Sequence, residues 1–144
     1  MSYVPVTKIL FVCTGNSARS QMAEGFTSAY GKGKVEAFSA GMEPKGLNPF
    51  ALEVMGEKGI DIHGQYSKPF SEELAREMDY VITVCGNAEG RCPLLPSKVR
   101  RVHWPLEDPA QATGSPEEVR EVFRRSRDEI DRLVIEFLFS FDSI

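Results

Sequence analysis

The sequence predicts a single α/β domain, residues 1–144, in which a four-stranded parallel sheet is flanked by helices on both faces. Short apolar runs recur without alternation, as in strands buried on both faces of a parallel sheet. Segments with helical spacing of apolar residues follow these runs. No linker, repeat, charge block or low-complexity tract interrupts this order, so one domain accounts for all 144 residues.

The chain opens with a strand, a tight loop and a helix. The apolar run Lys8 to Val12 is the first predicted strand. Residues 17–30 carry apolar side chains at helical spacing, and Gly31 can take the left-handed conformation that ends a helix. A second strand is predicted at residues 35–40.

Two helices are predicted before the next strand. Asn48 is a suitable N-cap for a helix that begins at Pro49, where proline is favoured, and ends near Gly59. Residues 60–69 are predicted as a loop, and Ser71 begins a short acidic helix.

Two further strands and a long helix complete the predicted fold. The strands are expected at residues 80–84 and 99–104. Ser115, Pro116 and Glu118 form the start of a helix with a capping box. This helix carries its apolar residues on one stripe: Val119, Val122, Phe123, Ile130, Leu133, Val134, Phe137, Leu138 and Phe141.

Charge and cysteine content exclude several classes of function. A net charge of −4 provides no basic field for a nucleic-acid backbone or an anionic membrane. No apolar run reaches the roughly 18 residues of a membrane span, and no signal segment is recognised. Three cysteines are an odd number for a disulfide framework. We therefore expect a soluble, cytoplasmic monomer whose cysteines are reactive or bind metal.

The loop between the first strand and the first helix is predicted to bind an oxyanion. Its five residues are Thr14, Gly15, Asn16, Ser17 and Ala18. This length allows the loop to curl, so that its N–H groups and the first turn of the helix point at an anion. Arg19 can add two donors to a tetrahedral oxyanion. A Walker-type phosphate loop is absent.

Cys13 stands at the mouth of this loop, where a thiolate would be nucleophilic. The loop N–H groups, Arg19 and the hydroxyl of Ser20 or Ser17 are the groups expected to stabilise it. A buried, inert cysteine with a surface arginine nearby is the structural alternative. Cys85 follows the third strand and Asp108 lies beyond the fourth, so adjacency of the first and third strands would bring these groups to one edge of the sheet.

The loop and several shorter segments resemble one family. The segment "CTGNSARSQMAEG" at the first strand-to-helix turn resembles the low-molecular-weight tyrosine phosphatase fold. Within that fold, the chain is similar to the thioredoxin-coupled arsenate reductases from Lys8 to about Leu133. The matching pieces are "SAG" (39–41), "NP" (48–49), "GIDI" (59–62), the Cys85/Cys92 segment, "CPLLP" (92–96) and "HWPLEDPA" (103–110).

The resemblance implies a relay of three cysteines without a bound cofactor or metal. Cys13 attacks arsenate, Cys85 attacks Cys13 and releases arsenite, and Cys92 attacks Cys85. Thioredoxin then reduces the last disulfide. Phosphate and sulfate are expected to compete as oxyanions. The resemblance also implies that Asp108 is the general acid, with the neighbouring Glu107 as the competing candidate and a solvated acidic turn as the structural alternative.

Three alternatives remain open for the cysteines. A phosphotyrosine or phosphomonoester phosphatase would use Cys13, Arg19 and Asp108 alone. A non-enzymatic oxyanion or redox sensor would bind a partner when Cys85 and Cys92 are oxidised. These two thiols could also be packed or bound to zinc, although a spacing of seven residues fits no usual zinc pattern.

The segment between Cys85 and Cys92 is predicted to change conformation on oxidation. A regular helix would separate the two residues by about 10 Å along its axis. Bridged cysteines need Cα atoms within about 7 Å. Gly86, Gly90 and Pro93 weaken or end a helix here, so the segment is expected to unwind and expose the disulfide to a partner.

The chain departs from the family pattern at two positions. Ala18 replaces a cysteine that precedes the loop arginine in many relatives. Some relatives bind potassium through residues that match Asn16, Glu24 and Ser39, plus an aspartate, and Lys68 stands where that aspartate aligns. We expect the Lys68 ammonium to replace the potassium ion, pair with Glu24 and brace Asn16. A surface lysine is the alternative, and no catalytic role is assigned to His63 or His103.

Overall fold

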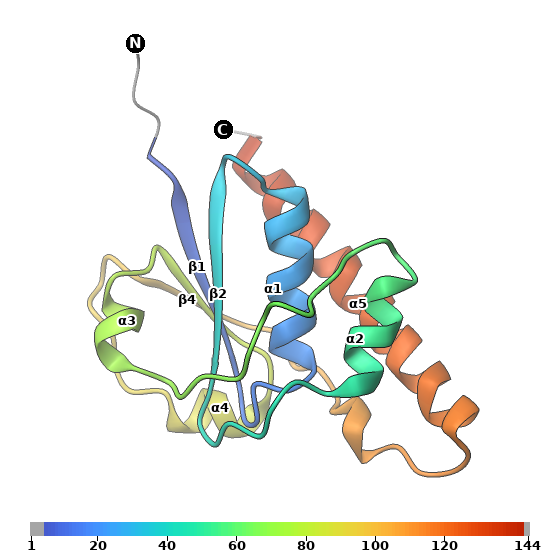
Figure 1. Ribbon diagram of the computed structural model, residues 1–144. Coiled ribbons are helices and arrows are strands. Elements are labelled where there is room, and N and C mark those ends of the chain that lie inside the picture. Colours follow the sequence, from blue (N-terminus) through green and yellow to red (C-terminus); the bar gives the residue numbers. More distant parts are fainter. Residues whose placement is uncertain (1–4, 143–144) are drawn as a thin grey trace.

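The computed structural model describes residues 5–142. In this part of the chain, strands alternate with helices and form a parallel sheet (Figure 1). Its elements are β1 (Thr7–Cys13), α1 (Arg19–Tyr30), β2 (Val35–Gly41), α2 (Pro49–Gly56), α3 (Glu72–Arg76), β3 (Tyr80–Thr83), α4 (Gly86–Arg91), β4 (Arg100–His103), the 3-10 turn η1 (Pro109–Gln111) and α5 (Pro116–Asp142). In this part of the chain, no helix is both long and apolar enough to cross a bilayer.

The four strands are all parallel and lie in the order β2-β1-β3-β4. β1 has a neighbour on each side, and the side chains of residues 9–12 are fully buried. This burial on both faces explains why the apolar run does not alternate. The predicted α/β domain with a four-stranded parallel sheet is confirmed.

Helices cover both sides of this sheet. Figure 1 shows α1, α2 and α5 on one side and α3 on the other, with α4 at the end where the strands stop. Within the apolar stripe of α5, Phe123, Ile130 and Val134 are buried in the core, while the side chain of Phe141 lies outside the described part of the chain. α1 packs directly on β1 and β2, and α5 packs mainly on α1 and α2.

Element boundaries differ from the predictions by a few residues. The first helix begins at Arg19 instead of residue 17, because residues 14–18 bond to the segment after β2. α2 ends at Gly56, because Gly59 adopts a φ of 76° and the N–H of Ile60 bonds back to Met55. β3 and β4 stop short of the predicted ends, at Thr83 and His103.

Candidate active site

The loop between β1 and α1 turns its carbonyl groups outward. Four of its carbonyl oxygens accept main-chain N–H groups of residues 42–48, at distances of 2.7–3.1 Å. They belong to Cys13, Thr14, Gly15 and Ser17. Since C=O and N–H point in opposite directions within a peptide plane, the N–H groups of these peptides face the inside of the curve. Gly41 permits this contact, because a Cβ there would lie 2.7 Å from the Asn16 nitrogen.

Asn16 fixes the shape of the loop. It is fully buried and takes a left-handed conformation, with φ at 46°, which asparagine tolerates better than most residues. Its side-chain oxygen accepts the main-chain N–H of Lys68 at 2.9 Å. Its carbonyl oxygen accepts from Gln21 Nε2 at 3.0 Å and from the Ser67 hydroxyl at 2.6 Å. The loop is therefore tied to α1 and to the segment before α3.

The Cys13 sulfur lies at the last residue of β1, almost fully buried, and contacts two polar groups. The main-chain N–H of Asn16 donates to it at 3.1 Å, and the Ser20 Oγ lies 2.9 Å away. Both groups can stabilise a thiolate. The sequence left Ser17 and Ser20 as alternatives for the hydroxyl, and the structure gives this contact to Ser20.

Arg19 and Asp108 lie at the same cavity as Cys13. This cavity has a volume of about 500 Å³ and is lined by the loop, Arg19, Asp108 and Lys45, among others. Arg19 Nη1 donates to the carbonyl oxygen of Leu106 at 3.1 Å, and Nη2 lies 3.6 Å from Asp108 Oδ2. The guanidinium is thus held beside the carboxylate that the sequence places beyond β4.

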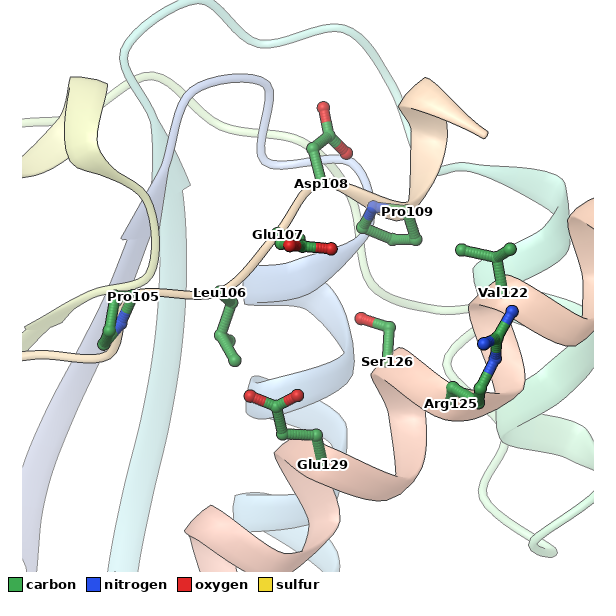
Figure 2. A pocket seen from close by; sticks show the side chains of 9 residues that line it. All are labelled: Pro105, Leu106, Glu107, Asp108, Pro109, Val122, Arg125, Ser126 and Glu129. Atoms are coloured by element: carbon green, nitrogen blue, oxygen red, sulfur yellow. The ribbon is translucent and has the colours of Figure 1, made fainter. Parts of the chain in front are cut away.

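The two candidate acids, Glu107 and Asp108, lie on different sides of their loop. Figure 2 shows Glu107 on the side of α5, near Ser126 and Glu129, while Asp108 points away from that helix. Both line a second cavity of about 530 Å³ between the loop and α5, but only Asp108 also lines the cavity with Cys13. The N–H of Ala110 donates to Asp108 Oδ1 at 3.0 Å and helps to orient the carboxylate.

Cys85 lies beside the loop, as expected from adjacent first and third strands. β1 and β3 are paired, and the sulfur of Cys85 lies 3.3 Å from the Thr14 hydroxyl. The N–H of Ala88 also donates to this sulfur at 3.3 Å, so Cys85 is the N-cap of α4. Asn87 Nδ2 donates to Thr14 Oγ1 at 3.0 Å.

Cys92 lies at the opposite end of α4, and all three cysteines are unbridged and buried. Burial raises the pKa of the Cys92 thiol, and the nearby charge of Arg101 opposes part of that shift. Residues 86–91 form a helix while the cysteines are unbridged, and a helix of this length keeps Cys85 and Cys92 too far apart to form a disulfide. Within residues 5–142, no three His, Cys, Asp or Glu side chains gather to hold a metal ion.

Glu24, Ser39 and Lys68 form a polar group behind the loop. The Ser39 hydroxyl donates to Glu24 Oε1 at 2.6 Å, and Lys68 Nζ lies 3.9 Å from the same oxygen. Burial raises the pKa of Glu24 and lowers that of Lys68. The ammonium also donates to the Tyr66 carbonyl at 2.6 Å, whereas the contact with Asn16 comes from the Lys68 main chain.

Three residues of the site were missed from the sequence. Gln21 and Ser67 hold Asn16, and Lys45 adds a cation at the cavity that contains Cys13. Gln21 lies on α1, where the spacing of the apolar residues indicates only which side chains pack in the core. The other two lie in polar loops, where no local signal distinguishes a buried contact from an exposed one.

Comparison with known proteins identifies the family of this chain. The model of the family described as "Low molecular weight phosphotyrosine protein phosphatase" matches residues 8–143. The chain belongs to this family. Among solved structures, a low-molecular-weight protein tyrosine phosphatase from T. tengcongensis is 27% identical, with a TM-score of 0.78 over 93% of this chain and 99% of that one.

Relatives with higher sequence identity to this chain are arsenate reductases. Those of Shouchella clausii and Bacillus subtilis are 50% and 46% identical, each over 90% of this chain and 93% of the relative. The structure of an arsenate reductase in the phosphate binding state is 36% identical, with a TM-score of 0.75 over 94% of this chain and 98% of that one. A thioredoxin-dependent arsenate reductase of Corynebacterium glutamicum is 30% identical, with a TM-score of 0.72 over 94% of this chain and 64% of that one. The resemblance stated from the sequence is confirmed.

Proposed function

We propose that this chain reduces arsenate to arsenite through three cysteines in sequence, with thioredoxin as the electron donor. The observation that carries the proposal is the position of Cys85, whose sulfur lies 3.3 Å from the Thr14 hydroxyl in the loop that begins at Cys13. Hydrolysis of a phosphoester needs the loop, Arg19 and an acid, but no second sulfur. The names of the relatives support the same reaction.

In the first step, the Cys13 thiolate attacks arsenic and forms a sulfur–arsenic bond. Asp108 donates a proton to a hydroxyl group of arsenate, which leaves as water. Arg19 and the inward N–H groups of the loop balance the negative charge of the oxyanion. The contact between Arg19 and Asp108, at 3.6 Å, supports these roles because it keeps both groups at the same cavity.

In the second step, the Cys85 thiolate attacks the Cys13 sulfur. The electron pair of the sulfur–arsenic bond stays with arsenic, so As(V) becomes As(III) and leaves as arsenite. A Cys13–Cys85 disulfide remains. Asn87 donates to the oxygen of Thr14, which leaves the Thr14 hydroxyl hydrogen free to donate to Cys85 and stabilise its thiolate.

In the third step, the Cys92 thiolate attacks the Cys85 sulfur and releases Cys13 as a thiolate. The Cys85–Cys92 disulfide then accepts two electrons from the two thiols of thioredoxin. α4 must unwind for this bond to form, because its two ends lie beyond bridging distance while the segment is helical. The unwound segment would present the disulfide to thioredoxin.

Arsenate-dependent oxidation of NADPH in the presence of thioredoxin and thioredoxin reductase tests the proposal. We expect many turnovers, with one arsenite formed for each NADPH. Cys85→Ser and Cys92→Ser should each stop the reaction after a single event. Multiple turnovers by either variant would contradict the relay, and no turnover by the unsubstituted chain would favour a sensor.

Phosphomonoester hydrolysis is the second candidate, because Cys13, Arg19 and Asp108 share one cavity and the family model describes phosphatases. Phosphate and arsenate have the same shape and charge, so weak phosphatase activity can coexist with reduction. Cys85→Ser separates the two reactions. It should leave hydrolysis of p-nitrophenyl phosphate near its original rate while it abolishes arsenate turnover.

A further inference from the structure

The short helix α4 does not have the composition of a stable helix. It spans only Gly86–Arg91 and contains two glycines. Glycine is one of the least favourable residues in a helix interior, and isolated helices of this length are marginal in water. Contacts with the rest of the fold must therefore hold these residues helical.

Arg101 on β4 supplies the most extensive of these contacts. Its Nη2 donates to the carbonyl oxygen of Glu89 at 2.6 Å, and its Nη1 lies 3.3 Å and 3.2 Å from the carbonyl oxygens of Cys92 and Pro93. These carbonyls lie at and just beyond the last turn of α4. A cation in this position satisfies acceptors that a helix end leaves unpaired and complements the helix dipole.

Glu89 ties the same turn to the sheet with its side chain. Its Oε1 lies 3.1 Å from Arg101 Nη2, and its Oε2 accepts the hydroxyl of Thr83 on β3. His103 Nδ1 on β4 lies 3.7 Å from the same Oε2. These hydrogen bonds and charges lower the pKa of Glu89, with the Thr83 hydroxyl as the largest cause, so the carboxylate is ionised at neutral pH.

The geometry points to a latch: we propose that Arg101 and Glu89 hold α4 helical in the dithiol state and thereby limit the stability of the Cys85–Cys92 disulfide. The carbonyls that Arg101 binds are brought together by the helix, so unwinding separates them. Each contact stabilises the dithiol form relative to the disulfide. Arg101 and Glu89 are positioning residues that act through α4. The inference rests on the proposed relay, because it concerns the same pair of thiols.

The equilibrium between dithiol and disulfide measures this latch without arsenate. In a Cys13→Ser background, Cys85 and Cys92 lose two protons and two electrons to oxidised glutathione, which becomes two reduced glutathiones as the sulfur–sulfur bond forms. Arg101→Gln should raise the equilibrium constant for disulfide formation about tenfold, which makes the reduction potential about 30 mV more negative. Glu89→Gln, which keeps some hydrogen bonds, should raise it about three- to fivefold, or about 15 to 20 mV.

The two variants separate the latch from a direct electrostatic effect on Cys92. Arg101 lowers the pKa of Cys92 and Glu89 raises it, so their removal changes the stability of the Cys92 thiolate in opposite directions. The latch requires both potentials to shift in the same direction. A shift of the Glu89→Gln potential to a less negative value would overturn the proposal in favour of simple charge effects.

Amide hydrogen exchange of residues 86–92 in the dithiol form gives a second readout. Exchange should accelerate about tenfold in Arg101→Gln and less in Glu89→Gln. Arg100→Gln is the matched control, because Arg100 is the neighbouring residue on β4 and its guanidinium lies over the Tyr80 ring, 6.0 Å from its centroid. It should change neither readout.

The outcomes distinguish the latch from the relay. A Cys85–Cys92 disulfide with the same potential and the same exchange rates in all variants would overturn the latch and leave the relay intact. Failure of Cys85 and Cys92 to form any disulfide in the Cys13→Ser chain would overturn the relay and, with it, the role of the latch.

Discussion

At the scale of single residues, the direction of one hydrogen bond decides how Cys13 is stabilised. Asn16 Nδ2 donates to the Ser20 Oγ at 2.8 Å, and the same Oγ lies 2.9 Å from the Cys13 sulfur. An oxygen that accepts from Asn16 keeps its own hydrogen free. The Ser20 hydroxyl is therefore set to donate to the sulfur, where it favours the thiolate.

Substitution of Ser20 tests this arrangement. Ser20→Ala should slow alkylation of Cys13 by iodoacetamide at neutral pH about tenfold, since a hydrogen bond to a charged group contributes about 1.5–3 kcal/mol. The rate is followed by mass spectrometry of the peptide that contains Cys13. Ser28→Ala, an exposed position on the same helix, is the control and should alkylate at the original rate. Equal rates in all three proteins would exclude a role for the Ser20 hydroxyl.

The role of general acid also depends on a single residue, since Glu107 and Asp108 are adjacent candidates. Asp108→Asn should lower kcat/KM for arsenate by about 10²- to 10⁴-fold, the usual loss for a general acid. Glu107→Gln should retain nearly full activity, because Glu107 faces α5 and not the cavity with Cys13. Steady-state NADPH oxidation measures both. The reverse order of effects would make Glu107 the acid.

Lys68 gives a prediction about potassium. Its ammonium lies 3.9 Å from Glu24 Oε1, so a potassium ion at that carboxylate would meet a like charge. Replacing sodium by potassium at constant ionic strength should therefore change neither the Tm nor the activity. Lys68→Asp should create a rise of Tm in potassium, while Lys32→Asp, at an exposed lysine, should not. A specific gain by the unsubstituted chain would contradict the replacement.

At the scale of elements, α4 has a cysteine at each end, and the two thiols lie in different surroundings. Cys85 caps the helix, where its sulfur accepts the N–H of Ala88 and lies 3.3 Å from the Thr14 hydroxyl. Cys92 lies at the other end, in surroundings that raise the pKa of its thiol through burial. The last step of the relay should therefore be the one most sensitive to pH.

The direction of this pH effect follows from the chemistry of attack. Only the thiolate attacks a disulfide, and a raised pKa lowers the thiolate fraction of Cys92 at neutral pH. As the pH falls from about 9 to about 7, acid-quenched samples should contain more Cys13–Cys85 and less Cys85–Cys92 disulfide. Disulfide mapping by mass spectrometry measures the ratio. A ratio that does not change over this range would show that burial of Cys92 does not limit the relay.

At the scale of the whole molecule, the parallel pairing of the strands brings the residues of the candidate site together. β1 and β3 are adjacent, and the N–H of Val84 bonds to the carbonyl oxygen of Val12 at 2.9 Å. Cys13, the last residue of β1, and Cys85, two residues beyond β3, therefore lie at neighbouring strand ends. Apolar runs were sufficient to predict the strands, and the usual location of ligands beyond their carboxyl ends predicted the edge.

The parts that escaped prediction depend on contacts between distant segments. Local spacing predicts Ser17 in the first helix, but its carbonyl oxygen accepts the main-chain N–H of Asn48 and this bond keeps it in the loop. Ser67 lies 51 positions from Asn16 and was part of a segment predicted only as a loop. Local patterns report the burial of apolar faces, and they carry no signal for a polar contact made after the fold closes.

Because the loop between β1 and α1 is tied to α1, to the segment after β2 and to the segment before α3, an anion bound there should stabilise the whole domain. A tetrahedral oxyanion at about one hundred times its Kd adds about 2.7 kcal/mol, which corresponds to a rise in Tm of roughly 8 °C for a domain of this size. Phosphate and sulfate, which arsenate resembles, are suitable probes in differential scanning calorimetry.

Arg19→Met should abolish most of this rise, because the buried guanidinium lies at the cavity beside Asp108 and is the group expected to bind the anion with two donors. Arg125→Met is the matched control, since Arg125 lines the separate cavity between the Asp108 loop and α5 and should leave the rise intact. An equal gain in both variants would mean that the anion stabilises the fold from another surface, and the loop would lose its assignment as the oxyanion site.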